Sequence, residues 1–225
     1  MNRYAIRLWR QLLVEFPQMI PWQTELGGAL VAAGKPEQAV ELYREMLSDP
    51  GVPPAATRQN IALAWIQAGR LDEAEAELRQ AIVLDPNDLK AKNNLGAVLV
   101  LQKRYEEAEA WYRRLIGEHP DNDDARDNLA AALVEQGKHA EAAAVYREAI
   151  AADPGRAEAY WGLAAALRKT DDHDGALRAY LEAARAVPDS AEAFYQLANV
   201  EEQYGRMTDA MEHYRQALRL DPAHA

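Results

Sequence analysis

The chain has 225 residues and a formal net charge of −11 at pH 7, which argues against nucleic acid and anionic membranes as partners. It contains no cysteine, so disulfide bonds, cysteine-ligated metals and thiol nucleophiles are excluded. No stretch approaches the ~20 apolar residues of a membrane-spanning helix, and we expect no membrane insertion. Because Arg3, Arg7 and Arg10 interrupt the first apolar segment, it is no signal-peptide core, and we expect a cytoplasmic location.

The sequence repeats itself every 34 residues (120 − 86 = 34). Prolines keep this step at Pro86, Pro120, Pro154, Pro188 and Pro222. Alanines keep it at Ala74, Ala108, Ala142, Ala176 and Ala210. Tyrosines keep it at Tyr112, Tyr146, Tyr180 and Tyr214. A fixed period of this length is the signature of a solenoid built from stacked units.

One period, residues 157–190, shows that the unit is a pair of helices. The first half carries one apolar helix face, at Tyr160, Leu163, Ala164 and Leu167. The second half carries another, at Ala176, Tyr180, Ala183 and Ala184. A polar turn at residues 170–172 separates them, Asp174 is expected to cap the second helix, and Pro188 is expected to end it.

This unit closely resembles the tetratricopeptide repeat family. The family pattern of Leu-Gly/Ala, a mid-repeat Gly, Ala, an aromatic, Ala and Pro is matched at Leu129-Ala130, Gly137, Ala142, Tyr146, Ala149 and Pro154. The resemblance implies an all-α fold, a right-handed superhelical solenoid of antiparallel helix pairs. It also implies that the first helix of each repeat lines a concave face where ligands bind.

Phased on this pattern, the chain holds six repeats and a half in one continuous solenoid domain. In chain order these are residues 1–19 (the second helix of a repeat only), 20–54 (with one inserted residue), 55–88, 89–122, 123–156, 157–190 and 191–225. The mid-repeat glycine is missing from the third and fifth repeats. Glu201 stands where the other repeats carry Leu or Trp, which predicts a softer last repeat because a packed carboxylate is costly unless it is solvated or bonded.

The sequence offers no catalytic, metal or cofactor site. His139 and His173 are 34 residues apart, which indicates one structural position in neighbouring repeats rather than catalysis. The acidic segments 121–124 and 171–174 lack the alternation and glycine of a calcium loop. We therefore expect a chain that is not an enzyme and takes no cofactor.

Function is then expected on the concave face. The residues expected on this face differ between the earlier and the later repeats. The half from the first three repeats is neutral and partly apolar, and the half from the fourth repeat onward is acidic with two aromatic residues. The candidate groove residues are Gln59, Asn60, Leu63, Ile66, Lys90, Asn93, Asn94, Asp124, Asp127, Asn128, Glu158, Trp161, Tyr195 and Asn199.

Asn60, Asn94 and Asn128 form a ladder at 34-residue intervals. An amide both donates and accepts hydrogen bonds, so such a row can hold a peptide backbone of any sequence. The ladder looks like that of O-linked N-acetylglucosamine transferases, although asparagine is also common at this position in the family. Trp161 and Tyr195 serve either as packing residues or as aromatic anchors for a ligand.

The sequence predicts a non-catalytic scaffold that binds a peptide or a partner helix, apolar at one end and basic at the other. One alternative is the substrate-recruiting region of a larger enzyme such as a glycosyltransferase. Another is a self-assembling structural repeat protein. Apolar residues near the chain start also predict a homodimer through the chain ends, with Trp9, Leu12 and Leu13 as contact residues.

Overall fold

The computed structural model describes residues 2–16 and 19–222, and these residues are helical apart from short connections. This described part forms thirteen helices: α1 (Asn2–Glu15), α2 (Ile20–Ala32), α3 (Pro36–Met46), α4 (Pro54–Gln67), α5 (Leu71–Leu84), α6 (Leu89–Leu101), α7 (Tyr105–Glu118), α8 (Asp123–Glu135), α9 (His139–Ala152), α10 (Ala157–Arg168), α11 (His173–Ala186), α12 (Ala191–Gln203) and α13 (Met207–Leu220). The expected all-helical fold class is confirmed. The repeat boundaries and the handedness of the superhelix stay predictions.

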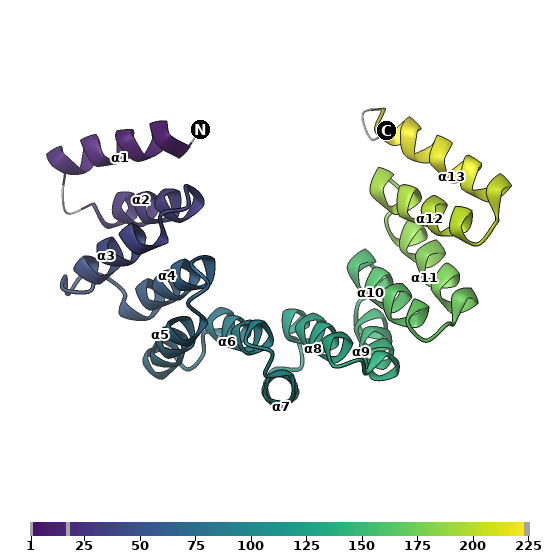
Figure 1. Cartoon of the computed structure of the whole chain (residues 1–225), viewed down its shortest axis with the longest axis horizontal. Coiled ribbons are helices and arrows are strands. Elements are labelled where there is room, and N and C mark those ends of the chain that lie inside the picture. Colours follow the sequence, from purple (N-terminus) through teal and green to yellow (C-terminus); the bar gives the residue numbers. More distant parts are fainter. Residues whose placement is uncertain (1, 17–18, 223–225) are drawn as a thin grey trace. The chain divides into compact units, whose positions relative to one another are not determined.

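The chain forms two compact units, unit 1 (Met1–Glu107) and unit 2 (Ala108–Ala225), and the boundary between them falls within α7. In unit 1, consecutive helices pack on one another from α1 to α6, and in unit 2 they do so from α8 to α13. Within unit 1, α2, α4 and α6 follow one another along one side, with α3 and α5 on the other; α8, α10 and α12 share a side of unit 2 in the same way (Figure 1). The first helices of the repeats therefore form one face of each unit.

Small residues let the two helices of a repeat approach closely. The repeated alanines Ala74, Ala142, Ala176 and Ala210 are fully buried. A leucine or isoleucine of the first helix is also buried in every repeat, at Leu26, Ile61, Leu95, Leu129, Leu163 and Leu197. Burial of such a side chain stabilises the fold by roughly 1.5–3 kcal/mol, which explains why the apolar pattern dictates the packing.

Two tyrosines fit their neighbouring helix only because glycine stands opposite. A Cβ atom added at Gly27 would lie 2.3 Å from Cζ of Tyr43, and one added at Gly162 would lie 2.2 Å from Cζ of Tyr146. Tyr43 is buried against α2 and donates its hydroxyl to the Thr24 carbonyl at 3.3 Å. These glycines are therefore sites of close approach between helices.

The turn inside each repeat contains a residue in the left-handed region. Glycine takes this conformation at Gly69, Gly137 and Gly205, whereas Lys103 (φ 60°) and Asp171 (φ 58°) take it in the third and fifth repeats. The two repeats that lack the glycine thus keep its backbone conformation. A side chain at positive φ carries steric strain that glycine does not.

We expect Lys103→Gly and Asp171→Gly each to raise the free energy of unfolding by about 0.5–1 kcal/mol. The left-handed conformation costs ~1–2 kcal/mol for other residues, whereas glycine loses roughly 0.5–1 kcal/mol more chain entropy on folding. Urea unfolding followed by circular dichroism measures the change. The matched control, Gly137→Lys, should destabilise the chain by a similar amount. Equal stability of all three variants and the parent chain would contradict the strain argument.

The start of α11 differs from the sequence prediction. Asp172, not Asp174, is the cap: its Oδ1 accepts the hydrogen bond from the Gly175 backbone N–H at 2.8 Å. Asp174 lies in the first turn of the helix, where a negative charge still interacts favourably with the helix dipole. The prediction was wrong because the helix begins at His173, and the cap must precede the first helical residue.

Glu201 on α12 is buried, and it has a specific partner. His213 Nδ1 lies 2.7 Å from Glu201 Oε2, a hydrogen bond in which the ring N–H donates. The imidazole also stacks on Phe194, with ring centroids 6.0 Å apart. The structure therefore supplies the bonded state that a carboxylate in a packed position requires. The softness of the last repeat stays a prediction.

Candidate functional site

In unit 1, the candidate residues on α4 and α6 include two unoccupied amides beside apolar side chains. Asn60 and Asn94 are half-buried, and neither side chain is bonded to another described residue. Leu63 is 45 % exposed, Ile66 is half-buried, and Lys90 is exposed. This surface can offer amide hydrogen bonds and apolar contact to the same ligand.

Two other candidate residues of unit 1 are less available to a ligand. Gln59 donates its side-chain amide to Asp88, whose other carboxylate oxygen accepts the Ala91 backbone N–H and caps α6. Gln59 thereby ties α4 to the start of the next repeat. Asn93 is buried, with 8 % of its surface exposed, so it is not part of the open face.

In unit 2, the expected acidic surface is partly neutralised within the chain. Asp127 on α8 accepts a hydrogen bond from Arg156, which precedes α10. Burial raises the pKa of Asp127 above its ordinary value, against the opposing charge of Arg156. Asp124 and Glu158 are exposed, and Asn128 is half-buried with no bond to another described side chain. Among the candidate carboxylates, Asp124 and Glu158 are therefore the ones open to a ligand.

Tyr146 is a residue of this surface that the sequence analysis did not select. It comes from α9, but its ring end lies against Gly162 of α10, in the space that an asparagine side chain would otherwise occupy. Burial and then the negative charge of Asp127 raise the pKa of Tyr146 above its ordinary value. The sequence feature that could have indicated this contact is Gly162, which replaces asparagine at the next position of the ladder after Asn128. Because glycine has no side chain, the ring of Tyr146 fits there.

The aromatic residues of unit 2 have different surroundings. Trp161 is half-buried, and its Nε1 has no acceptor. Tyr195 is 37 % exposed, with its ring centroid 5.8 Å from that of Tyr214. The Tyr214 hydroxyl donates to Asn199 at 2.6 Å, so Asn199 is held within the chain. The Trp161 Nε1 is itself buried, so the part of Trp161 that a ligand can contact is the exposed portion of its ring.

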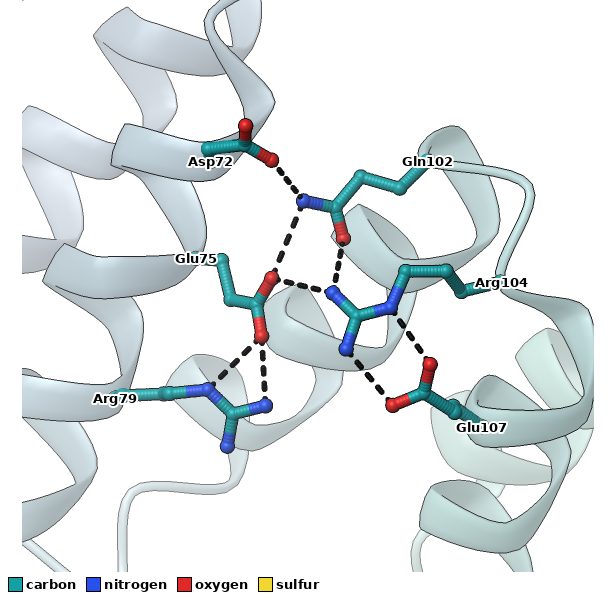
Figure 2. A network of polar contacts seen from close by, with 6 residues as sticks. All are labelled: Asp72, Glu75, Arg79, Gln102, Arg104 and Glu107. Atoms are coloured by element: carbon teal, nitrogen blue, oxygen red, sulfur yellow. Dashed lines mark hydrogen bonds and ion pairs between the residues drawn. The ribbon is translucent and has the colours of Figure 1, made fainter.

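A polar network absent from the sequence predictions joins two repeats of unit 1 (Figure 2). Its members are Asp72, Glu75, Arg79, Gln102, Arg104 and Glu107. Glu75 accepts from Arg104 at 2.7 Å and from Arg79 at 2.6 Å, while Arg104 donates two bonds to Glu107. Burial would raise the pKa of Glu75, but the bonds from its partners hold it below the ordinary value.

The same contact recurs in unit 2. Glu109 accepts from Lys138 at 2.8 Å, from Gln136 at 3.0 Å and from Arg113 at 3.0 Å. Lys138 holds the pKa of Glu109 at about 2, so the contact stabilises the fold at neutral pH and is lost only as the pH falls from 4.5 toward 2. The signal in the sequence was the equal spacing of acid and base (104 − 75 = 29 and 138 − 109 = 29).

At the chain start, the proposed dimer residues are partly covered by the chain itself. Trp9 packs on Trp22 of α2 with ring centroids 6.2 Å apart, and Leu12 and Leu13 are half-buried. The exposed apolar side chains of α1 include Leu8 and Val14 instead. The homodimer stays a prediction.

Within residues 2–16 and 19–222, no helix is long and apolar enough to cross a membrane. The same residues contain no cluster of three or more His, Asp or Glu side chains that could hold a metal ion.

A family model described as tetratricopeptide repeat matches residues 60–123, 128–190 and 166–225, and a second model with this description matches residues 30–88. The chain belongs to the tetratricopeptide repeat family. Tetratricopeptide repeat proteins are generally protein-interaction modules, and the matching models describe repeats rather than a catalytic domain.

No curated protein matches this tetratricopeptide repeat chain. It is similar to a solved tetratricopeptide repeat protein from Parabacteroides merdae, with a TM-score of 0.68 and 16 % identity over 98 % of this chain and 87 % of that one. It is also similar to PilF of Pseudomonas aeruginosa, with a TM-score of 0.63 and 21 % identity over 99 % of this chain and 94 % of PilF. A third similar structure is that of YrrB, a TPR protein with an unusual peptide-binding site, with a TM-score of 0.52 and 22 % identity over 82 % of this chain and 95 % of YrrB. At these identities the likeness shows the fold alone.

Proposed function

We propose that this chain is a non-catalytic scaffold that binds a partner protein through the faces formed by the first helices of its repeats. The observation that carries the proposal is the pair Asn60 and Asn94 in unit 1, whose amides are unoccupied and lie on helices that also expose Leu63. Unoccupied amides on successive repeats suit an extended peptide backbone. The similar protein YrrB has a peptide-binding site, which supports the same use of the fold here.

The surface of unit 2 favours a partner segment with basic character. Asp124 and Glu158 are exposed and unpaired among the described residues, and the half-buried Trp161 offers part of its apolar ring. Lys or Arg side chains of the partner would meet these carboxylates, and such rim charges mainly accelerate association. Asp127 contributes less than the sequence suggested, because Arg156 already neutralises it.

A displayed peptide library selected on the purified chain tests the proposal. Binding of the selected peptides should weaken about tenfold or more when Asn60→Ala and Asn94→Ala are combined, because each lost hydrogen bond contributes about 0.5–1.5 kcal/mol. Asn87→Ala, at an exposed loop position, is the matched control and should leave binding unchanged. Peptides that bind both variants as well as the parent chain would place the site elsewhere.

A further inference from the structure

A second groove lies in unit 2 on the side of the second helices of the repeats. It runs between α9 and α11 over α10, has a volume of about 320 Å³, and has an apolar floor that includes Ile150, Leu163 and Leu167. None of the candidate groove residues from the sequence analysis lines it. The groove is therefore separate from the faces that carry the proposed function.

The positive and negative side chains along this groove differ in whether they have partners within the chain. Arg147 and Arg178 are exposed, and neither guanidinium is paired with another described residue. The two carboxylates of the groove already have donors: Asp172 caps α11, and Glu182 accepts from Arg185 at 2.6 Å. Both carboxylates of the groove therefore have a hydrogen-bond partner, whereas its two guanidinium groups have none among the described residues; Asp172 keeps its negative charge, because its donor is a neutral backbone N–H.

The equivalent groove one repeat earlier is neutralised by the chain itself. It is lined by residues 34 positions earlier, among them Arg113, which corresponds to Arg147 (147 − 113 = 34). Arg113 donates to Glu109 at 3.0 Å and, across the groove, to Glu141 at 3.2 Å. The arginine at this position of the repeat is thus held in ion pairs in one groove and is unpaired in the next.

Three differences between the two repeats account for this contrast. Both carboxylates that pair with Arg113 are absent from the later repeat, and a new guanidinium is present. The corresponding residues, each 34 positions apart, are Glu109 and Ala143, Glu141 and Gly175, and Ala144 and Arg178. These three differences remove the partners of the first arginine and add a second arginine. In the opposite direction, Tyr160 of the later groove replaces Arg126 of the earlier one, and the apolar floor remains.

We propose that this groove binds an acidic segment of a partner protein. A carboxylate of that segment lies between Arg147 and Arg178, and a neighbouring apolar side chain covers Ile150. Guanidinium groups bind carboxylates through paired, charge-assisted hydrogen bonds. The net charge of −11 repels a long polyanion such as nucleic acid, whereas a short acidic segment meets chiefly the local positive charge.

Fluorescence anisotropy with a labelled amphipathic peptide of about twelve residues, with leucines on one face and glutamates beside them, tests this proposal. Binding should weaken about tenfold or more when Arg147→Gln and Arg178→Gln are combined, and also when glutamine replaces the glutamates of the peptide. The matched control combines Arg215→Gln with Arg219→Gln, which removes the same charge from exposed positions on α13 and should leave binding unchanged.

Methyl NMR spectra of the titrated chain should show shifts at Ile150 and Leu163. The Asn60→Ala and Asn94→Ala variant should bind the acidic peptide normally, which separates this site from the proposed function. Equal weakening by the two arginine pairs, or equal binding of the glutamine peptide, would overturn the proposal. So would absence of binding, or tighter binding of single-stranded RNA or anionic vesicles that is lost in the Arg147→Gln and Arg178→Gln variant.

Discussion

Replacement of His213 with alanine is expected to lower the free energy of unfolding of the last repeat by about 1–3 kcal/mol, because it leaves a buried carboxylate without its donor. Glu201 has only 6 % of its side chain exposed, and its Oε2 lies 2.7 Å from the imidazole Nδ1. Urea unfolding gives the overall change, and hydrogen exchange of α12 and α13 shows whether the loss is confined to the last repeat.

The double variant Glu201→Leu and His213→Ala separates the buried charge from the packing of the ring. Leucine is the residue at the equivalent position of four other repeats, at Leu30, Leu99, Leu133 and Leu167. It removes the carboxylate that His213→Ala leaves unpaired, so the double variant should regain most of the lost stability. If it is as unstable as His213→Ala alone, the stacking of the imidazole on Phe194 is the main contribution, and the argument from the carboxylate is wrong.

The helices could be predicted from the sequence because their determinants are local and periodic. The apolar face of residues 157–190 lies within a few helical turns, and each repeat presents the same pattern again. The start of α11 was misplaced by two residues because Asp172 and Asp174 are both good capping residues, and only the backbone conformation distinguishes them.

The candidate site was less predictable because its side chains bond between repeats. Helical periodicity indicated which positions share a face, but it could not show that Asp127 is paired with Arg156, 29 residues later (156 − 127 = 29). The contact between the Tyr146 ring on α9 and Gly162 on α10 could not be predicted from periodicity either, because it depends on which neighbouring residue leaves space for the ring. Such contacts require the packed arrangement of three helices.

Gly27→Ala is expected to destabilise unit 1 by about 1–3 kcal/mol, although alanine is the better helix former. A Cβ atom at this position would lie 2.3 Å from Cζ of Tyr43, and overpacking in a core has this cost. Tyr43 is 3 % exposed, so its ring cannot turn into solvent to make room. Thermal and urea unfolding of the variant, with hydrogen exchange in α2 and α3, measure the effect.

Gly28→Ala is the matched control, because nothing lies within 4 Å of a Cβ atom there. It should stabilise the chain by about 0.5–1 kcal/mol through helix propensity alone. The second repeat indicates the rescue, since it combines Ala62 with Leu78 at the positions of Gly27 and Tyr43. Tyr43→Leu added to Gly27→Ala should therefore recover part of the loss. If Gly27→Ala changes the stability of the chain as Gly28→Ala does, the Tyr43 ring can shift without an energetic cost. The close approach of Tyr43 would then not be the reason for glycine at position 27.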